Sequence, residues 1–175
     1  IVVPGDRVLS CLPLFHSFGF TANLWLPLLR GIRFVTITSP LETRKIAEAI
    51  QREKTTILMS APTFLRPFLK KADPEHLRSL RGIIAGAEKM PPDLYQAFRE
   101  RFGVTIYEGY GLTETTPVVA VNLPDPPVPT RTASPQSGNR LGSVGRLLPG
   151  MTARITDPET GAEQSLFSIG ILKLK

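Results

Sequence analysis

One short run of the chain combines small residues with groups that could bind a nucleotide. In EGYGLTETT, residues 108–116, two glycines flank Tyr110, and Thr113 and Glu114 follow closely. Tyr110 could stack on a planar base, and Thr113 could donate a hydrogen bond to a phosphate oxygen. Glu114 could hold the Mg²⁺ that accompanies a polyphosphate. The run therefore indicates a phosphate site.

Two simpler explanations compete with that one. A glycine-rich strand end is often only a turn, and Thr and Glu are also favoured at the N-terminus of a helix. The run is not a dinucleotide fingerprint, because the third glycine is missing, and GxxxxGK[ST] occurs nowhere in the chain. On these residues alone, a turn and a phosphate site both remain open.

A second small-residue loop, GAEKM at 86–90, follows an apolar stretch that begins at Gly82. Gly86 and Ala87 would let the backbone lie flat against a base. Both loops follow predicted parallel strands, and ligands of parallel α/β sheets bind beyond the carboxyl ends of the strands. If the two strands are neighbours, the two loops open on the same crevice.

The elements that must position these loops alternate between strands and helices. Strands are predicted at 8–15, 32–38, 55–61, 82–88 and 104–111, and helices at 21–31, 39–54, 62–71, 73–80 and 91–103. This alternation predicts an α/β fold with a mostly parallel sheet and flanking helices. The clearest helix start is SPLE, with Ser39 as N-cap, Pro40 at the first helical position and Glu42 completing a capping box.

The composition of the chain changes after Leu123. We expect an α/β nucleotide- and acyl-binding part at 1–123, an exposed Pro- and Ser-rich loop at 124–140, and the start of a β-rich, barrel-like subdomain at 141–175. The chain begins abruptly and ends within an apparent strand. It is therefore expected to be an internal piece of a longer protein.

Bulk properties exclude several classes. The 175 residues are 42% hydrophobic, which is enough for a core, and the net charge of +6 is spread along the chain rather than gathered in a block, which disfavours nucleic-acid binding. Cys11, the single cysteine, cannot form an internal disulfide and is expected in the core, as is Trp25 with the leucines around it. Residues 8–29 carry no charged side chain, but Pro13 and Pro27 argue against a membrane-spanning helix.

Four motifs in order resemble the adenylate-forming superfamily, the AMP-binding acyl-CoA synthetases and their relatives. They are LPLFHSFG (12–19), GAEKM (86–90), YGLTET (110–115) and GSVGRLLPG (142–150). Within that superfamily the chain looks closest to the acyl-acyl carrier protein synthetase part of bacterial 2-acylglycerophosphoethanolamine acyltransferases, with long-chain acyl-CoA synthetases as near neighbours.

The resemblance implies a two-step ligase reaction. The carboxylate of a fatty acid attacks the α-phosphate of ATP, with Mg²⁺ bound, to give an acyl-adenylate and pyrophosphate. A thiol of CoA, or the phosphopantetheine thiol of an acyl carrier protein, then takes the acyl group. The implied location is the cytoplasm. Whether other domains attach the parent protein to the inner face of the membrane is left open.

Site residues follow from the resemblance by position. Thr113 would contact the α-phosphate, Glu114 would ligate Mg²⁺, and His16 would lie near the substrate carboxylate. The implied nucleotide-binding residues are Gly86, Ala87, Glu88, Glu108, Gly109, Tyr110, Gly111, Leu112 and Thr113. Glu108 would accept a hydrogen bond from the adenine amino group.

Three parts of the family's site have no counterpart in the chain: the phosphate loop, the ribose-binding aspartate and the catalytic lysine. Without the loop and the lysine, stabilisation of charge at the α-phosphate is largely lost, so the isolated chain is expected to be inactive. The alternative is a non-catalytic α/β module whose basic surface binds an acidic partner protein.

Overall fold

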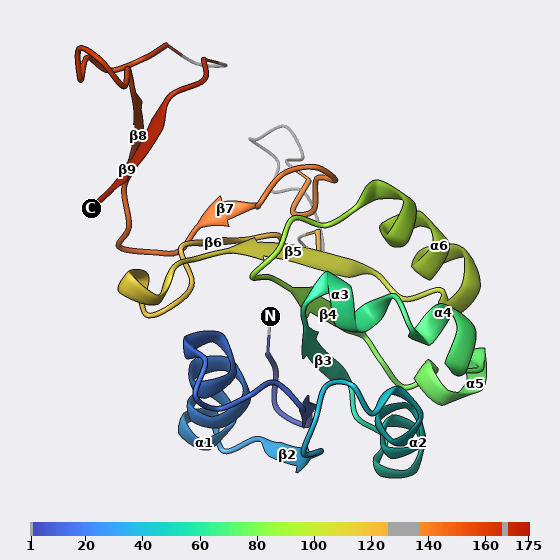
Figure 1. Ribbon diagram of the computed structural model, residues 1–175. Coiled ribbons are helices and arrows are strands. Elements are labelled where there is room, and N and C mark those ends of the chain that lie inside the picture. The colour runs from blue at the N-terminus through green and yellow to red at the C-terminus, as the bar shows by residue number, and fades with distance from the viewer. Residues whose placement is uncertain (1, 126–136, 166–167) are drawn as a thin grey trace, which may run out of the picture.

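The computed structural model describes residues 2–125, 137–165 and 168–175. Within these residues seven strands form one sheet in the order β2-β1-β3-β4-β5-β6-β7 (Figure 1). The first five strands in this order are parallel and the last two join antiparallel, which confirms the predicted mostly parallel sheet. The strands are β1 (Arg7–Ser10), β2 (Arg33–Thr36), β3 (Ile57–Ser60), β4 (Gly82–Ala85), β5 (Ile106–Tyr110), β6 (Ala120–Val121) and β7 (Arg146–Leu147).

Helices cover both faces of this sheet. One face carries α2 (Thr43–Glu53), α4 (Phe68–Lys71), α5 (Pro74–Leu77) and α6 (Pro92–Phe102), and the other carries the π-helix η1 (Gly19–Trp25) with α1 (Leu26–Arg30). The short helix α3 (Pro62–Leu65) follows β3. Side chains of a strand alternate between the two faces of the sheet. Leu58 therefore packs on the face covered by α2, α4, α5 and α6, while Ile57 and Met59 pack on the face covered by η1 and α1.

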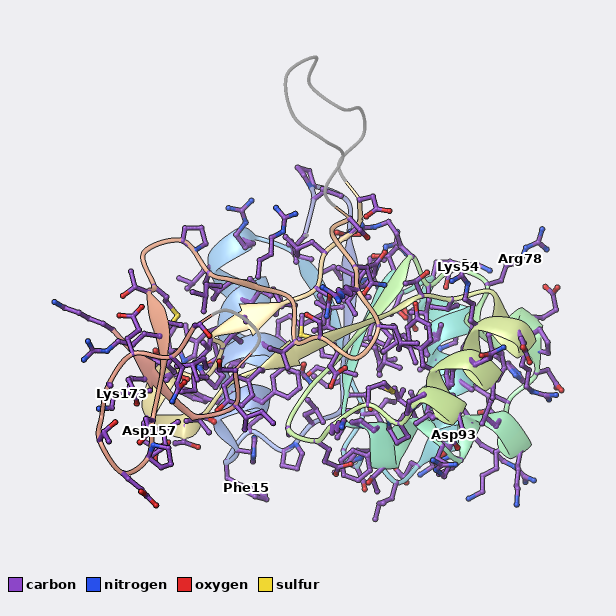
Figure 2. All side chains as sticks on the ribbon, turned by 90° about the horizontal axis from the view of Figure 1, so that it is seen from above. Phe15, Lys54, Arg78, Asp93, Asp157 and Lys173 are labelled. Atoms are coloured by element: carbon purple, nitrogen blue, oxygen red, sulfur yellow. The ribbon has the colours of Figure 1, made fainter. Side chains whose placement is uncertain are left out.

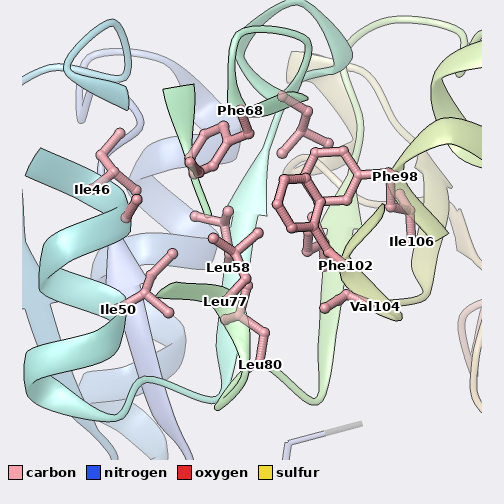
Figure 3. Close-up of a cluster of buried hydrophobic side chains, with 14 of the residues drawn as sticks. Ile46, Ile50, Leu58, Phe68, Leu77, Leu80, Phe98, Phe102, Val104 and Ile106 are labelled. Carbon is pink, nitrogen blue, oxygen red and sulfur yellow. The ribbon is translucent and has the colours of Figure 1, made fainter. Parts of the chain in front are cut away.

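The larger core lies between the sheet and α2, α4, α5 and α6 (Figure 3). Phe98 of α6 lies between Phe68 and Phe102, with ring centroids 6.2 Å and 4.7 Å apart respectively. Ile46 and Ile50 contribute the apolar face of α2, as its 3.6-residue period requires. This core holds β3, β4 and β5 in register, and so fixes where their carboxyl ends lie.

The start of α2 differs from the predicted start. The helix begins at Thr43, four residues beyond Ser39, with Glu42 at the N-cap position. The Ser39 hydroxyl instead accepts a hydrogen bond from the Leu41 backbone N–H at 3.3 Å. Serine side chains satisfy nearby N–H groups in turns as readily as at caps, so the capping-box prediction was wrong.

The prediction of a helix at 21–31 is confirmed in place but not in its packing. Gly31 ends α1 in a left-handed conformation, with φ 62°. Trp25, expected in the core, is 44% exposed and meets Phe20 edge to face. The first half of the segment winds as a π-helix, and both of its aromatic side chains, Phe20 and Trp25, are partly exposed.

The carboxyl-terminal residues form a separate hairpin. Strands β8 (Ala153–Thr156) and β9 (Ile171–Leu174) pair antiparallel, and they stand apart from the main sheet in Figure 1. A second β element at this end is therefore confirmed, whereas β7 belongs to the main sheet. Most of the predicted loop at 124–140 lies outside the described residues, and the domain boundaries stay a prediction.

One smaller expectation is met. Cys11 is buried, and burial raises the pKa of its thiol to about 12. No helix in the described residues is long and apolar enough to cross a membrane.

Candidate active site

A pocket of about 290 Å³ opens at the carboxyl ends of the parallel strands. Three chain segments meet in it: the loop after β1, the end of β4, and the end of β5 with its return strand β6. The lining residues are His16, Ser17, Phe18, Ile84, Ala85, Gly86, Ala87, Gly109, Tyr110, Gly111, Leu112, Thr113, Glu114, Pro117, Val118 and Val121. The volume suits a nucleobase or the head of an acid, but is at the low end for ligand pockets.

The pocket joins the two loops because β4 and β5 are adjacent and parallel, with Ala85 opposite Glu108. Gly86 and Ala87 therefore line the same pocket as Tyr110 and Thr113, as the sequence predicts for neighbouring strands. Ala87 adopts φ 69°, a left-handed conformation that costs a residue with a side chain about 1–2 kcal/mol.

The YGLTET loop is built by close backbone packing and by one threonine. A Cβ on Gly111 would lie 1.5 Å from the carbonyl oxygen of Pro117, so only glycine lets the chain fold back here. Thr113–Thr115 then forms a 3₁₀ turn. The Thr115 hydroxyl accepts from the Leu112 N–H at 3.0 Å and donates to the Leu112 carbonyl at 2.8 Å. Thr113 and Glu114 are left exposed at the rim of the pocket.

The loop after β1 presents His16 in one tautomer. The Phe18 backbone N–H donates to His16 Nδ1 at 3.2 Å, so the neutral ring carries its proton on Nε2 and can donate from there. Phe15, next to it, is 94% exposed and points away from the ribbon in Figure 2. His16 thus lines the pocket while its apolar neighbour does not.

Asn23 of η1 holds the loop after β1 in place through hydrogen bonds. It is fully buried, and with its amide oxygen turned toward the loop it accepts from the backbone N–H groups of Cys11 and Leu12, each at 3.1 Å. Gly19 packs against the same loop, since a Cβ there would lie 2.2 Å from the Pro13 carbonyl oxygen. The π-helix therefore fixes the position of residues 13–18 relative to the sheet.

Two predicted residues lie outside the pocket lining. The Glu88 carboxylate accepts from both the backbone N–H and the hydroxyl of Thr63, at 3.2 Å and 2.7 Å, and so caps the N-terminus of α3. Glu108 accepts from the Met90 N–H at 3.0 Å. Their nucleotide-binding roles stay predictions, and the structure gives both carboxylates a structural partner.

Several lining residues were not predicted. Val118 and Val121 reach the pocket because β6 folds back antiparallel along β5, with Tyr110 opposite Ala120. Ser17 and Phe18 belong to the histidine motif, and only their position beside His16 could have singled them out. The Ser17 hydroxyl lies 3.2 Å from that of Thr113, which joins segments 96 residues apart.

The part of the pocket that the structure describes lacks the positive charge that a polyphosphate needs. Among the described residues that line it, Glu114 is the only carboxylate and none is a Lys or Arg. The described part of the chain holds no group of three or more His, Cys, Asp or Glu side chains that could bind a metal ion. A nucleotide here would need cationic or metal partners beyond these side chains.

Comparisons with known proteins agree on one family. The family model described as AMP-binding enzyme matches residues 1–173. A probable CoA ligase, CCL5, from Humulus lupulus is 31% identical over 98% of this chain, and the chain covers 30% of it. The long-chain-fatty-acid–CoA ligase of Bacillus subtilis is 29% identical over 97% of the chain, which covers 29% of it. The chain thus spans under a third of the length of these relatives.

Solved structures show the same fold. Apo MatB from Rhodopseudomonas palustris superposes with a TM-score of 0.82 at 28% identity, over 98% of this chain and 32% of that one. The anthranilate CoA ligase AuaEII, in complex with anthranoyl-AMP, gives a TM-score of 0.81 at 29% identity, over 97% and 31%. The o-succinylbenzoate CoA synthetase of Bacillus subtilis, in complex with AMP, gives 0.79 at 26%, over 99% and 33%.

Proposed function

This chain belongs to the AMP-binding enzyme family, and on that premise we propose that it is the central part of an ATP-dependent acid–thiol ligase. The observation that carries the proposal is the single pocket in which His16, Tyr110, Thr113 and Glu114 meet. A histidine donor, an aromatic ring, a hydroxyl and a carboxylate are the groups that an acid and a nucleotide would need side by side. The family match favours this enzyme over a non-catalytic binding module, for which the comparisons offer no support.

In the proposed reaction the acid lies near His16 and the nucleotide near Tyr110. The His16 Nε2–H donates to one carboxylate oxygen, while the other oxygen attacks the α-phosphorus and pyrophosphate leaves. Thr113 donates a hydrogen bond to an α-phosphate oxygen, which holds the phosphorus in line with the attacking oxygen. The acyl-adenylate then passes its acyl group to a thiol, and AMP is released.

Mg²⁺ fits this pocket only as a companion of the nucleotide. The ion commonly binds one or two carboxylates and completes its shell with substrate phosphates and water. Glu114, exposed at the rim, is suited to be that single protein ligand. When bound, the ion would neutralise part of the polyphosphate charge.

The acid is proposed to be a fatty acid. A long-chain and a medium-chain ligase are both among the relatives, and the apolar side chains of Phe18, Ile84 and Val121 line the pocket. The acceptor thiol is CoA, as the names of the relatives suggest, or the phosphopantetheine of an acyl carrier protein. With an acyl carrier protein as the acceptor, the full-length protein is proposed to be an acyl-acyl carrier protein synthetase that acts in phospholipid metabolism.

The test is acid-dependent ATP–pyrophosphate exchange by the full-length protein. Purified protein is assayed with fatty acids of graded length and with aromatic acids, and thioester formation is then followed with CoA and with holo acyl carrier protein. Exchange with fatty acids supports the proposal, and thioester on only one of the two thiols identifies the acceptor. Absence of exchange with every acid would contradict it.

Glu114→Ala is the decisive variant in that assay. We expect exchange to fall by at least about 100-fold, because a carboxylate that holds the metal contributes mainly to charge stabilisation in the transition state. The matched control is Glu48→Ala, which removes an exposed carboxylate on α2, far from the pocket, and should leave exchange unchanged. Circular dichroism checks that both variants fold, and an unchanged rate in Glu114→Ala would remove Glu114 from the metal site.

The isolated 175-residue chain is expected to show no exchange. None of the described residues that line its pocket is a Lys or Arg that could stabilise the charge that develops at the α-phosphate. Robust exchange by this chain alone would show that the residues described here suffice for adenylation.

A further inference from the structure

The loop that carries His16 and the loop that carries Thr113 touch through one hydrogen bond between side chains. Ser17 Oγ lies 3.2 Å from Thr113 Oγ1, and either oxygen can be the donor. The two residues are 96 positions apart in the chain and both line the pocket. The bond therefore links the part of the site expected to bind the acid with the part expected to bind phosphate.

Both partners are presented on firmly held backbone. The Ser17 loop is held from below by buried Asn23 and by the close packing of Gly19 on Pro13. Thr113 begins a 3₁₀ turn closed by two hydrogen bonds between Thr115 and Leu112. Thr115 is thus used to close the turn, which leaves the Thr113 hydroxyl for a partner across the pocket.

The donor in the hydrogen bond between Ser17 and Thr113 is decided once a phosphate binds to Thr113. If Thr113 donates its single proton to a phosphate oxygen, its hydrogen bond with Ser17 can persist only with Ser17 as the donor and the Thr113 oxygen as the acceptor. The resulting chain runs from the Ser17 O–H to the Thr113 oxygen and from the Thr113 O–H to the phosphate. Hydrogen bonds in such chains polarise and strengthen one another.

We infer that Ser17 is a positioning residue, which orients the Thr113 hydroxyl toward a phosphate oxygen and couples the acid-binding loop to the nucleotide-binding loop. The inference rests on the proposed function for its catalytic part. Its binding part concerns only the affinity of the pocket for a nucleotide phosphate, and can be measured without turnover.

The binding test compares AMP with adenosine on the full-length protein by calorimetry. Ser17→Ala is expected to weaken AMP binding about 3- to 10-fold, as the loss of one hydrogen bond allows, and to leave adenosine binding unchanged. Ser17→Thr, which keeps the hydroxyl, should restore AMP binding. Ser39→Ala, which removes a hydroxyl from the turn before α2, is the matched control and should change neither affinity.

A double-mutant cycle tests whether Ser17 acts through Thr113. The loss caused by Ser17→Ala should vanish in a Thr113→Val background, because the hydroxyl that Ser17 orients is then absent. Equal losses in both backgrounds, equal losses for AMP and adenosine, or no AMP binding by the unaltered protein would each overturn the inference.

The catalytic part is read from two measurements, which are nucleotide affinity with and without saturating acid and the exchange assay. If Ser17 couples the two loops, saturating acid should tighten nucleotide binding in the unaltered protein, and this coupling should fall about 3- to 10-fold in Ser17→Ala. Coupling that persists in the variant would overturn this part. Loss of AMP affinity in Ser17→Ala together with no exchange by the unaltered protein would support the inference and contradict the proposed function, so the two can fail separately.

Discussion

At the residue scale, the glycines of the YGLTET region serve the packing of the chain on itself. Gly111 has no left-handed backbone angle, and its small size is required because the Pro117 carbonyl occupies the space of a Cβ. Gly86 is less restricted, since a Cβ there would lie 3.4 Å from the Gly109 carbonyl oxygen and 3.6 Å from the Phe18 ring. The two loops of the pocket therefore contain one indispensable glycine, Gly111, and one that tolerates a methyl group, Gly86.

Gly111→Ala is expected to destabilise the fold by about 3 kcal/mol, because the backbone of Pro117 must move to admit the methyl group. Gly86→Ala, the comparison variant, should lose under about 1 kcal/mol while narrowing the pocket. Chemical denaturation of both variants measures the difference. Equal stabilities would mean that the 111–117 turn relaxes without cost.

At the element scale, the site depends on how β6 is attached to its surroundings. Asn122, directly after β6, is buried and donates through Nδ2 to the carbonyl oxygens of Glu108 and Ser143, at 3.0 Å and 2.5 Å. Its Oδ1 accepts from the Arg140 N–H at 2.9 Å. One side chain thus ties the end of β5 to the segment that leads into β7, and holds the wall of the pocket formed by Val121.

Asn122→Ala is expected to lower the free energy of unfolding by about 2–3 kcal/mol, since it removes a buried side chain that makes three partly buried hydrogen bonds. Asn139→Ala, which loses only a 3.4 Å contact with the Tyr95 hydroxyl, is the control and should cost under about 1 kcal/mol. Hydrogen exchange should also speed up selectively at the amides of β6. Unchanged protection of β6 would contradict this account.

At the scale of the whole molecule, the sheet carries its site at one end and an ionic cluster at the other. Asp6, Thr56 and Arg81 precede β1, β3 and β4, so they meet where these strands begin. The Asp6 carboxylate accepts from Arg81 Nη2 at 2.6 Å, from the Thr56 hydroxyl at 2.7 Å and from the Val3 N–H at 2.8 Å. Burial by itself would raise the pKa of Asp6, but these hydrogen bonds outweigh it and the pKa is lowered.

This cluster makes the stability of the sheet depend on pH. Because the pKa of Asp6 is lower in the folded than in the unfolded chain, its contribution is complete above about pH 4 and is lost as the pH falls through the folded value. Asp6→Asn should cost about 1–3 kcal/mol at pH 7, less than a fully buried pair, because the Arg81 side chain is 42% exposed.

Thermal unfolding of the unaltered chain and Asp6→Asn from pH 7 to pH 2.5 measures this dependence. The two melting temperatures should begin to converge below about pH 4, where the unfolded chain takes up the proton first, and should meet once the pH is below the folded pKa of Asp6. A gap that stays constant down to pH 2.5 would show that Asp6 acts through packing and not through charge.

The fold was largely predictable from local patterns. The helix predicted at 91–103 is found as α6, which ends at Phe102, and the alternation of strands and helices predicted the parallel sheet. The start of α2 was not predicted correctly, because serine satisfies backbone N–H groups in turns as well as at caps. The exposure of Trp25 was also missed, since the turn of a π-helix does not follow the ordinary helical period.

The sequence by itself determined the residue types of the site and the order of its loops, because parallel strands bring their carboxyl ends to one edge. Only the tertiary structure decided which side chains are available there. Glu88 and Glu108 are held by Thr63 and Met90, and the hydroxyls of Ser17 and Thr113 meet across the pocket. The reason is physical: such contacts join residues far apart in the chain, and local propensities carry no information about the packing that brings them within hydrogen-bonding distance.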